Sequence, residues 1–250
     1  MTTPPLPTLD VQSNLLHTPS CHGMQELPTA HFERRRIAKY LSLIPPENPS
    51  SPIAENDATT APVDPSSPLF HHLTHGLALT IGSALGETPP STSQCLEAFL
   101  VPNKVHLTAG ARAWSKHAHR ALPPPTPGPE VEAEGDSATR KKGKKTESGG
   151  WWGTPSGPVK VINENALKLF WRIMENATWK NLHWLPHQVL VYEARVKEGY
   201  GMRWSQDRSQ PVPADGDDSP IDFADKPWVF RGFVEPMMEN GHEVGWRHPS

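Results

Sequence analysis

The chain has 250 residues, with 24 Lys and Arg against 27 Asp and Glu, and a net charge of −3. This balance excludes a polycation that coats nucleic acid or an anionic membrane. Cys21 and Cys95 lie far apart and outside any Cys-x-x-Cys pair, which excludes a disulfide framework and a cysteine-rich zinc site. No stretch approaches 18 uninterrupted apolar residues, so we expect no contact with a membrane.

The first 68 residues are predicted to be a mostly disordered lead-in with one short helix. Prolines are dense here, and the first nine residues contain no apolar core, which predicts no secretory signal. We therefore expect an intracellular protein, cytoplasmic or nuclear. Apolar spacing predicts a helix over 31–43 that ends before Pro45, with Arg34, Arg35 and Arg36 on a solvated face.

Three further helices are predicted before residue 123. The apolar residues of 69–85 are spaced four apart, as in a helix. Ser91 or Ser93 is placed to cap a second helix that stops near Pro102. Thr108 is placed to cap a third over 109–122, with Trp114 on its apolar face.

Residues 123–150 have the composition of a low-complexity loop. A polyproline run is followed by an acidic patch and then by a basic run. Two interpretations stay open for the basic run, a solvated loop or a signal for the nuclear import machinery. Its residues are Arg140, Lys141, Lys142, Lys144 and Lys145.

Eight of the nine tryptophans follow this loop. Apolar spacing predicts a helix over 163–177, and 179–186 is expected to turn into a buried strand over 187–196. Glycines at 199 and 201 predict a tight turn into the next strand, and a polar excursion over 207–226 precedes a strand over 228–234. This order predicts an α+β fold, a small antiparallel sheet with helices packed on one side.

We expect residues 69–250 to form one domain, with disordered insertions at about 123–150 and 207–226. The helices before the loop offer too little apolar surface for an independent core, so the Trp114 helix is predicted to pack on the sheet.

No metal or cofactor is predicted. The thirteen histidines include no set with metal-ligand geometry, because His117 and His119 would point about 200° apart on a helix. No phosphate-binding loop and no nucleophile elbow are present.

A polar set in the predicted sheet is the candidate site. Strand alternation puts Arg231 on one face with Val229 and Phe233, where an arginine needs a carboxylate or a bound anion. Glu193 and Glu235 are placed to pair with it, and an ion-paired network is favoured over an anion pocket. The candidate ligand-binding residues are His117, His187, Arg203, Arg231, Glu235, His242 and Glu243.

Several motifs resemble an uncharacterised eukaryotic protein family. They are LTAGARAWSKHAHR (107–120), LPH (185–187), GYGMRW (199–204), FRGFVEP (230–236) and GHEVGWRH (241–248). The resemblance implies one continuous fold from about 104 to 248, skipping the two insertions, and implies no activity.

The sequence favours a non-catalytic binding module whose Arg, His and Trp surface binds an anionic small molecule or peptide. Nucleic acid is not expected as the main partner, because residues 151–250 hold 11 basic and 13 acidic residues. The alternative is a hydrolase-type enzyme that uses His242 and Glu243, or His187, with Arg203 and Arg231 holding an anionic substrate.

Overall fold

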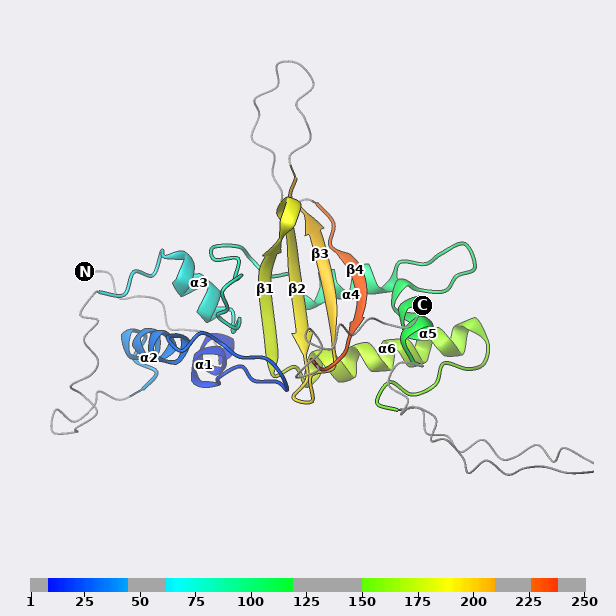
Figure 1. Cartoon of the computed structure of the whole chain (residues 1–250), viewed down its shortest axis with the longest axis horizontal. Helices are drawn as coiled ribbons and strands as arrows, with labels where there is room; N and C mark the ends of the chain where they lie inside the picture. The colour runs from blue at the N-terminus through cyan, green and yellow to red at the C-terminus, as the bar shows by residue number, and fades with distance from the viewer. Residues whose placement is uncertain (1–8, 45–61, 119–149, 210–225, 238–250) are drawn as a thin grey trace, which may run out of the picture.

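The computed structural model of the chain describes residues 9–44, 62–118, 150–209 and 226–237. Its centre is a four-stranded antiparallel sheet in the order β1-β2-β3-β4, a meander that confirms the predicted α+β class (Figure 1). The strands are β1 (Trp179–Leu185), β2 (Val189–Arg195), β3 (Gly201–Asp207) and β4 (Val229–Val234).

Two groups of helices flank the sheet (Figure 1). One group lies beside β1, and the other packs on the sheet through α4 and α5 against β4 and α6 against β2. The first group is α1 (Leu9–Leu16), α2 (Ala30–Tyr40) and α3 (Pro68–Thr74). The second is α4 (Thr92–Leu100), α5 (Ala109–His117) and α6 (Val159–Glu175).

Helix α3 is much shorter than the helix predicted over 69–85. Ser67 caps its start by accepting a hydrogen bond from the Phe70 N–H, and Gly76 ends it in the left-handed region at φ +70°. The chain then runs along the outer edge of β1, where the Ala78 N–H donates to the Lys180 carbonyl at 2.7 Å. The Ala84 N–H donates to the Leu182 carbonyl at 2.8 Å, so this segment covers the sheet edge.

Strand β1 lies in a segment, 179–186, that the sequence predicts only as a lead into the strand over 187–196. The alternation of apolar and polar residues along β1 is weak. Among the side chains of β1 that face inward, only Leu182 belongs to the main core. The backbone pairs with β2 on one side and bonds to residues 78–84 on the other. Those partners are remote in sequence, which is why the local pattern does not predict the strand.

The first helical group holds structure that the sequence does not predict. Helix α1 lies within the expected lead-in and packs on α2 and α3. Arg34 of α2 is buried, not solvated as predicted, and its two terminal nitrogens each donate to Glu26 at 2.7 Å. Glu26 also accepts from the Leu79 N–H at 2.8 Å, so this ion pair ties α2 to the segment that covers β1.

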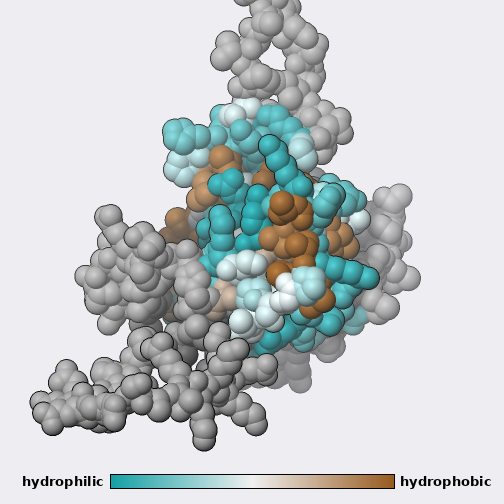
Figure 2. Space-filling model, turned by 90° about the vertical axis from the view of Figure 1, so that its right-hand side faces the viewer, coloured by the Kyte–Doolittle hydropathy of each residue, from teal (hydrophilic) through white to brown (hydrophobic). Residues whose placement is uncertain are grey.

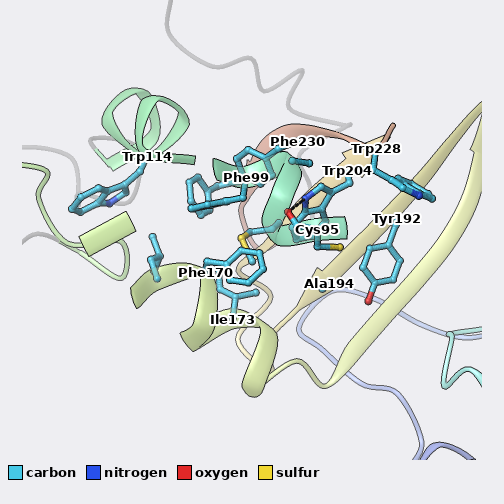
Figure 3. Close-up of a cluster of buried hydrophobic side chains, with 14 of the residues drawn as sticks. Cys95, Phe99, Trp114, Phe170, Ile173, Tyr192, Ala194, Trp204, Trp228 and Phe230 are labelled. Carbon is cyan, nitrogen blue, oxygen red and sulfur yellow. Dashed lines mark hydrogen bonds between the residues drawn. The ribbon is translucent and has the colours of Figure 1, made fainter. Parts of the chain in front are cut away.

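The tryptophan-rich core lies between the sheet and α4–α6 (Figure 3). The Trp204 indole N–H donates to the Cys95 carbonyl at 3.0 Å, and the Trp114 indole N–H donates to the Trp152 carbonyl at 2.9 Å. Trp114 thus belongs to the same core as the sheet, as predicted, and these indoles are packing groups. Cys95 is buried among them, which raises the pKa of its thiol to about 12.

The outer surface of the second helical group is mainly hydrophilic, with a band of hydrophobic residues (Figure 2). Val159 and Val161 of α6 are among the exposed apolar side chains. In the described parts of the chain, no helix has the length and apolar character that crossing a membrane requires. The division of the chain at residue 68 stays a prediction.

Helices α4 and α5 cross at Gly110, where a Cβ would lie 2.0 Å from the Phe99 ring. We predict that Gly110→Ala lowers the free energy of unfolding by about 1–3 kcal/mol through overpacking, although alanine is the better helix former. Urea denaturation measures the change. Lys116→Ala, at an exposed position of the same helix, should stay within about 0.5 kcal/mol. An unchanged or higher stability of Gly110→Ala would contradict the prediction.

Candidate phosphate-binding site on the sheet

The face of the sheet that turns away from the tryptophan-rich core is polar. Core side chains such as Leu190 and Tyr192 alternate along β2 with side chains of this second face. The register pairs Val191 with Ser205 and Glu193 with Arg203, so the side chains of these four residues lie on this second face. We call it the polar face, formed by Asn181, His183, Val191, Glu193, Arg195, Arg203, Ser205, Asp207 and Arg231.

Arg231 reaches this face by ordinary alternation from core-facing Phe230, and a β-bulge follows directly after it. The register shifts between Arg203 and Trp204, so that Trp204 pairs with Phe230 but Arg203 pairs with Gly232. Arg231 is the extra residue, and Gly232 takes the required positive φ of +127°. The bulge also turns Phe233 into the core beside Phe230, with ring centroids 5.6 Å apart. Strict alternation, which places Phe233 with Arg231, is therefore wrong here.

Glu193 is the hub of the polar face. Its carboxylate is 2% exposed and accepts hydrogen bonds from two arginines. Arg195 Nε donates to one oxygen at 2.6 Å, and Arg203 Nε and Nη2 donate to the other at 2.8 and 2.5 Å. Burial would raise the pKa of Glu193, but the charges and hydrogen bonds of Arg195 and Arg203 outweigh it and hold the pKa below its usual value.

The two arginines of this network differ in exposure. Arg195 is buried, and its Nη1 also donates to the carbonyls of Gly199 and Glu235 at 2.6 and 2.7 Å. It is therefore a structural tie between strands. The Arg203 side chain is 39% exposed, so it can contact a ligand while Glu193 fixes its orientation.

Arg203 and Arg231 line one concavity of about 460 Å³ on the polar face. Ser205 and Asp207 of β3 and apolar residues of the β1–β2 hairpin complete its wall. Hydrogen bonds from the Ser209 side chain and backbone lower the pKa of Asp207, which keeps this carboxylate ionised. Two guanidinium groups in one concavity suit a phosphate, which accepts hydrogen bonds from their planar forks.

His183 lies on the same face, in β1, opposite Val191. Its Nδ1 is buried and has no hydrogen-bond partner within the described ranges. Burial lowers the pKa of His183, and the charge of Arg203 lowers it further against the opposing effect of Glu193. At neutral pH the imidazole is therefore uncharged and able to accept a proton.

The structure unites two of the predicted site residues, Arg203 and Arg231. His117 lies instead at the end of α5, with its ring centroid 6.4 Å from that of Phe233. His187 is exposed in the turn between β1 and β2, at φ +64°. Glu235 contributes its carbonyl to Arg195 and does not pair with Arg231 in any contact that the structure shows.

His242 and Glu243 lie outside the described residues, as do the basic residues at 140–145. The structure adds polar-face residues that the sequence prediction missed, namely Arg195, His183, Ser205 and Asp207. Their signal is the alternation of polar residues at 203, 205 and 207, and at 193 and 195, within otherwise apolar strands. Among the described residues, no cluster of three His, Cys, Asp or Glu side chains could hold a metal ion.

Fold and site together define an α+β domain with an arginine-lined concavity on its sheet. Residues 128–210 match the family model of the CdiA C-terminal tRNase toxin domain. Of the described structure, the matched segment includes α6 and the first three strands, and hence most of the polar face. No curated protein and no solved structure is similar to the chain.

This match corrects the resemblance to an uncharacterised eukaryotic family. The matched segment contains only two of the motifs that carried that resemblance, LPH and GYGMRW. The match also contradicts two predictions, because the matched domain is described as a tRNase. These are that the protein is a non-catalytic binding module and that nucleic acid is not its main partner. The predicted anionic small molecule, peptide and import partners gain no support from it.

The charge argument against nucleic acid failed for a physical reason. It averaged over residues 151–250, of whose thirteen acidic residues five lie between 215 and 225, outside the described structure. Binding depends on local charge, and the exposed side chains of Arg203 and Arg231 lie together in one concavity.

We predict that Glu193→Gln lowers the free energy of unfolding by about 3–5 kcal/mol, because buried Arg195 would keep its charge without a carboxylate partner. Urea denaturation at neutral pH measures the loss. Asp207→Asn, on the same face but exposed, should cost less than about 1 kcal/mol. Equal losses in the two variants would show that Glu193 is not the hub of the network.

Proposed function

We propose that this protein is an RNA-cleaving enzyme that acts on tRNA, with the polar face as its substrate site. The observation that carries the proposal is the match of residues 128–210 to a tRNase domain, since this segment supplies β1, β2 and β3. The concavity between Arg203 and Arg231 supports it independently.

The scissile phosphate binds between Arg203 and Arg231. Guanidinium groups stabilise the charge that builds on the phosphoryl oxygens in the transition state, and they do so best when their orientation is fixed beforehand. Glu193 fixes Arg203 through two short hydrogen bonds to one carboxylate oxygen. Exposed Arg231 reaches the phosphate from the neighbouring strand, since it lines the same concavity.

Cleavage proceeds by attack of the ribose 2′-oxygen on phosphorus. His183, which pairs across the sheet with Val191 of the concavity wall, accepts the 2′-hydroxyl proton. The new P–O2′ bond forms a cyclic phosphate, and the P–O5′ bond breaks. His187, in the turn between two rim residues of the concavity, donates the proton that the leaving 5′-oxygen takes up. His183, which is uncharged, thus accepts a proton, and His187, which is exposed, donates one.

Glu193 is a positioning residue in this scheme. A general base works best with a pKa near the operating pH, whereas the pKa of Glu193 is held low by its arginines. Both of its oxygens are occupied, one by each arginine. Its role is to hold Arg203 towards the phosphate.

Arg231→Ala is the primary test of the proposal. We predict that it lowers kcat/KM for tRNA cleavage by about 10²–10³, as expected for loss of one transition-state donor. Because Arg231 is exposed, the free energy of unfolding should stay within about 0.5 kcal/mol of wild type. Arg112→Ala, on the exposed surface of α5, is the control for the lost charge. If wild type cleaves no RNA, or Arg231→Ala cleaves as fast as the control, the proposal is wrong.

The pH dependence tests His183. Its pKa lies below 6.5, so kcat/KM should be lost on acidification with a midpoint below 6.5, as the imidazole becomes charged and can no longer accept a proton. His183→Gln should reduce the rate and remove this limb of the profile. His31→Gln, at an exposed position of α2, should retain it. An unchanged profile in His183→Gln would assign the proton transfer to another group.

A further inference from the structure

A second hollow lies away from the concavity, between α1 and the start of β1. It has a volume of about 470 Å³ and is formed by four separate stretches of the chain. We call it the basic groove. Its lining residues are Ser13, Asn14, His17, Thr18, Pro19, Ser20, Gly76, Ala177, Thr178, Lys180 and Lys197.

The groove is positive on a protein whose net charge is −3. Lys180 and Lys197 line it together with His17, and its lining contains no Asp or Glu. Neither lysine ammonium makes an ion pair or a hydrogen bond to any residue that the structure describes. In this respect they differ from Arg34, Arg195 and Arg203, which all have carboxylate partners.

Hydrogen bonds fix the walls of the groove. Ser20 and Thr178 exchange two of them, from the Ser20 N–H to the Thr178 carbonyl at 3.0 Å and from the Thr178 hydroxyl to the Ser20 carbonyl at 2.7 Å. The Asn14 amide donates to the Thr74 carbonyl at 2.9 Å. A Cβ on Gly76 would lie 2.5 Å from the Asn14 side-chain oxygen, so only glycine allows this close approach. A preformed site loses little conformational entropy when it binds a ligand.

The lining also indicates what kind of ligand fits. It contains hydroxyl, amide and ammonium groups but no aromatic ring apart from the imidazole of His17. Phosphate oxygens accept hydrogen bonds from such groups, whereas unpaired bases are usually held by stacking on aromatic side chains. The groove therefore suits a sugar-phosphate backbone and not a base.

The groove and the concavity lie at opposite ends of β1. The groove includes Lys180 and the concavity includes Leu185, five residues later along a seven-residue strand. At about 3.4 Å per residue these positions are about 17 Å apart. A single phosphodiester cannot span that distance, whereas a folded RNA can contact both places.

We propose that the basic groove is a second RNA-binding site, which holds the phosphate backbone of the substrate at a distance from the cleaved bond. The identification of the ligand as RNA rests on the proposed function. The groove contributes affinity for long RNA through Lys180 and Lys197 and takes no part in the chemical step, because neither lysine lies in the concavity. It thereby favours tRNA over short oligonucleotides.

The double variant Lys180→Ala/Lys197→Ala tests the groove, and Lys104→Ala/Lys160→Ala, outside both hollows, is the control with the same loss of charge. Binding of tRNA is measured by fluorescence anisotropy at several salt concentrations, with Arg231→Ala present in every protein to suppress cleavage. Loss of two phosphate contacts should reduce the slope of log affinity against log salt by about 1.4–1.8. Cleavage of a dinucleotide, measured with Arg231 intact, should be unchanged.

The outcomes separate the groove from the catalytic proposal. If the groove variant and the control have the same salt slope, or if the groove variant loses dinucleotide cleavage, the second site is refuted. If the wild-type protein cleaves no RNA but its tRNA affinity depends on the two lysines, the groove stands and the proposed catalytic function falls. Restored affinity in Lys180→Arg/Lys197→Arg would confirm that positive charge is what the groove provides.

Discussion

The buried carboxylate of Glu193 is the constraint on which the polar face depends. A carboxylate that is only 2% exposed is costly to bury unless it is paired. The guanidinium groups of Arg195 in β2 and Arg203 in β3 pair with it. Arg195 then links the sheet to the carbonyls of Gly199 and Glu235. Arg203, oriented by the same carboxylate, is left with an exposed side that can reach a phosphate.

The two faces of the sheet have different roles, since one packs in the core and the other carries the candidate site. One face packs on α4–α6 through indole, phenyl and small side chains, and its polar atoms are used internally, as when the Trp204 indole N–H bonds to the Cys95 carbonyl. This core provides the rigidity that a preorganised site requires. Residues 78–84 bond along β1 and close the outer edge of the sheet, and the accessible part of the polar face lies at Arg203, Asp207 and Arg231.

The sequence predicted the parts of the fold that local patterns control. Ser91 forms the capping box of α4 with Gln94, Thr108 caps α5, and Gly199 takes φ +95° in the turn before β3. It did not predict β1, the early end of α3 or the burial of Arg34. Each of these depends on contacts between segments remote in sequence, such as the bonds from residues 78–84 to β1.

For the site, the sequence by itself determined that Arg203 and Arg231 lie on strands of one antiparallel sheet and that Trp114 packs in the core of that sheet. Only the tertiary structure decided that the two arginines share a concavity. The pairing of Trp204 with Phe230 across β3 and β4 places Arg231 beside Arg203, and the one-residue shift at the bulge sends Phe233 into the core. A one-residue shift exchanges the two faces of a strand, and no local pattern encodes it, because the bulge is fixed by packing across the sheet.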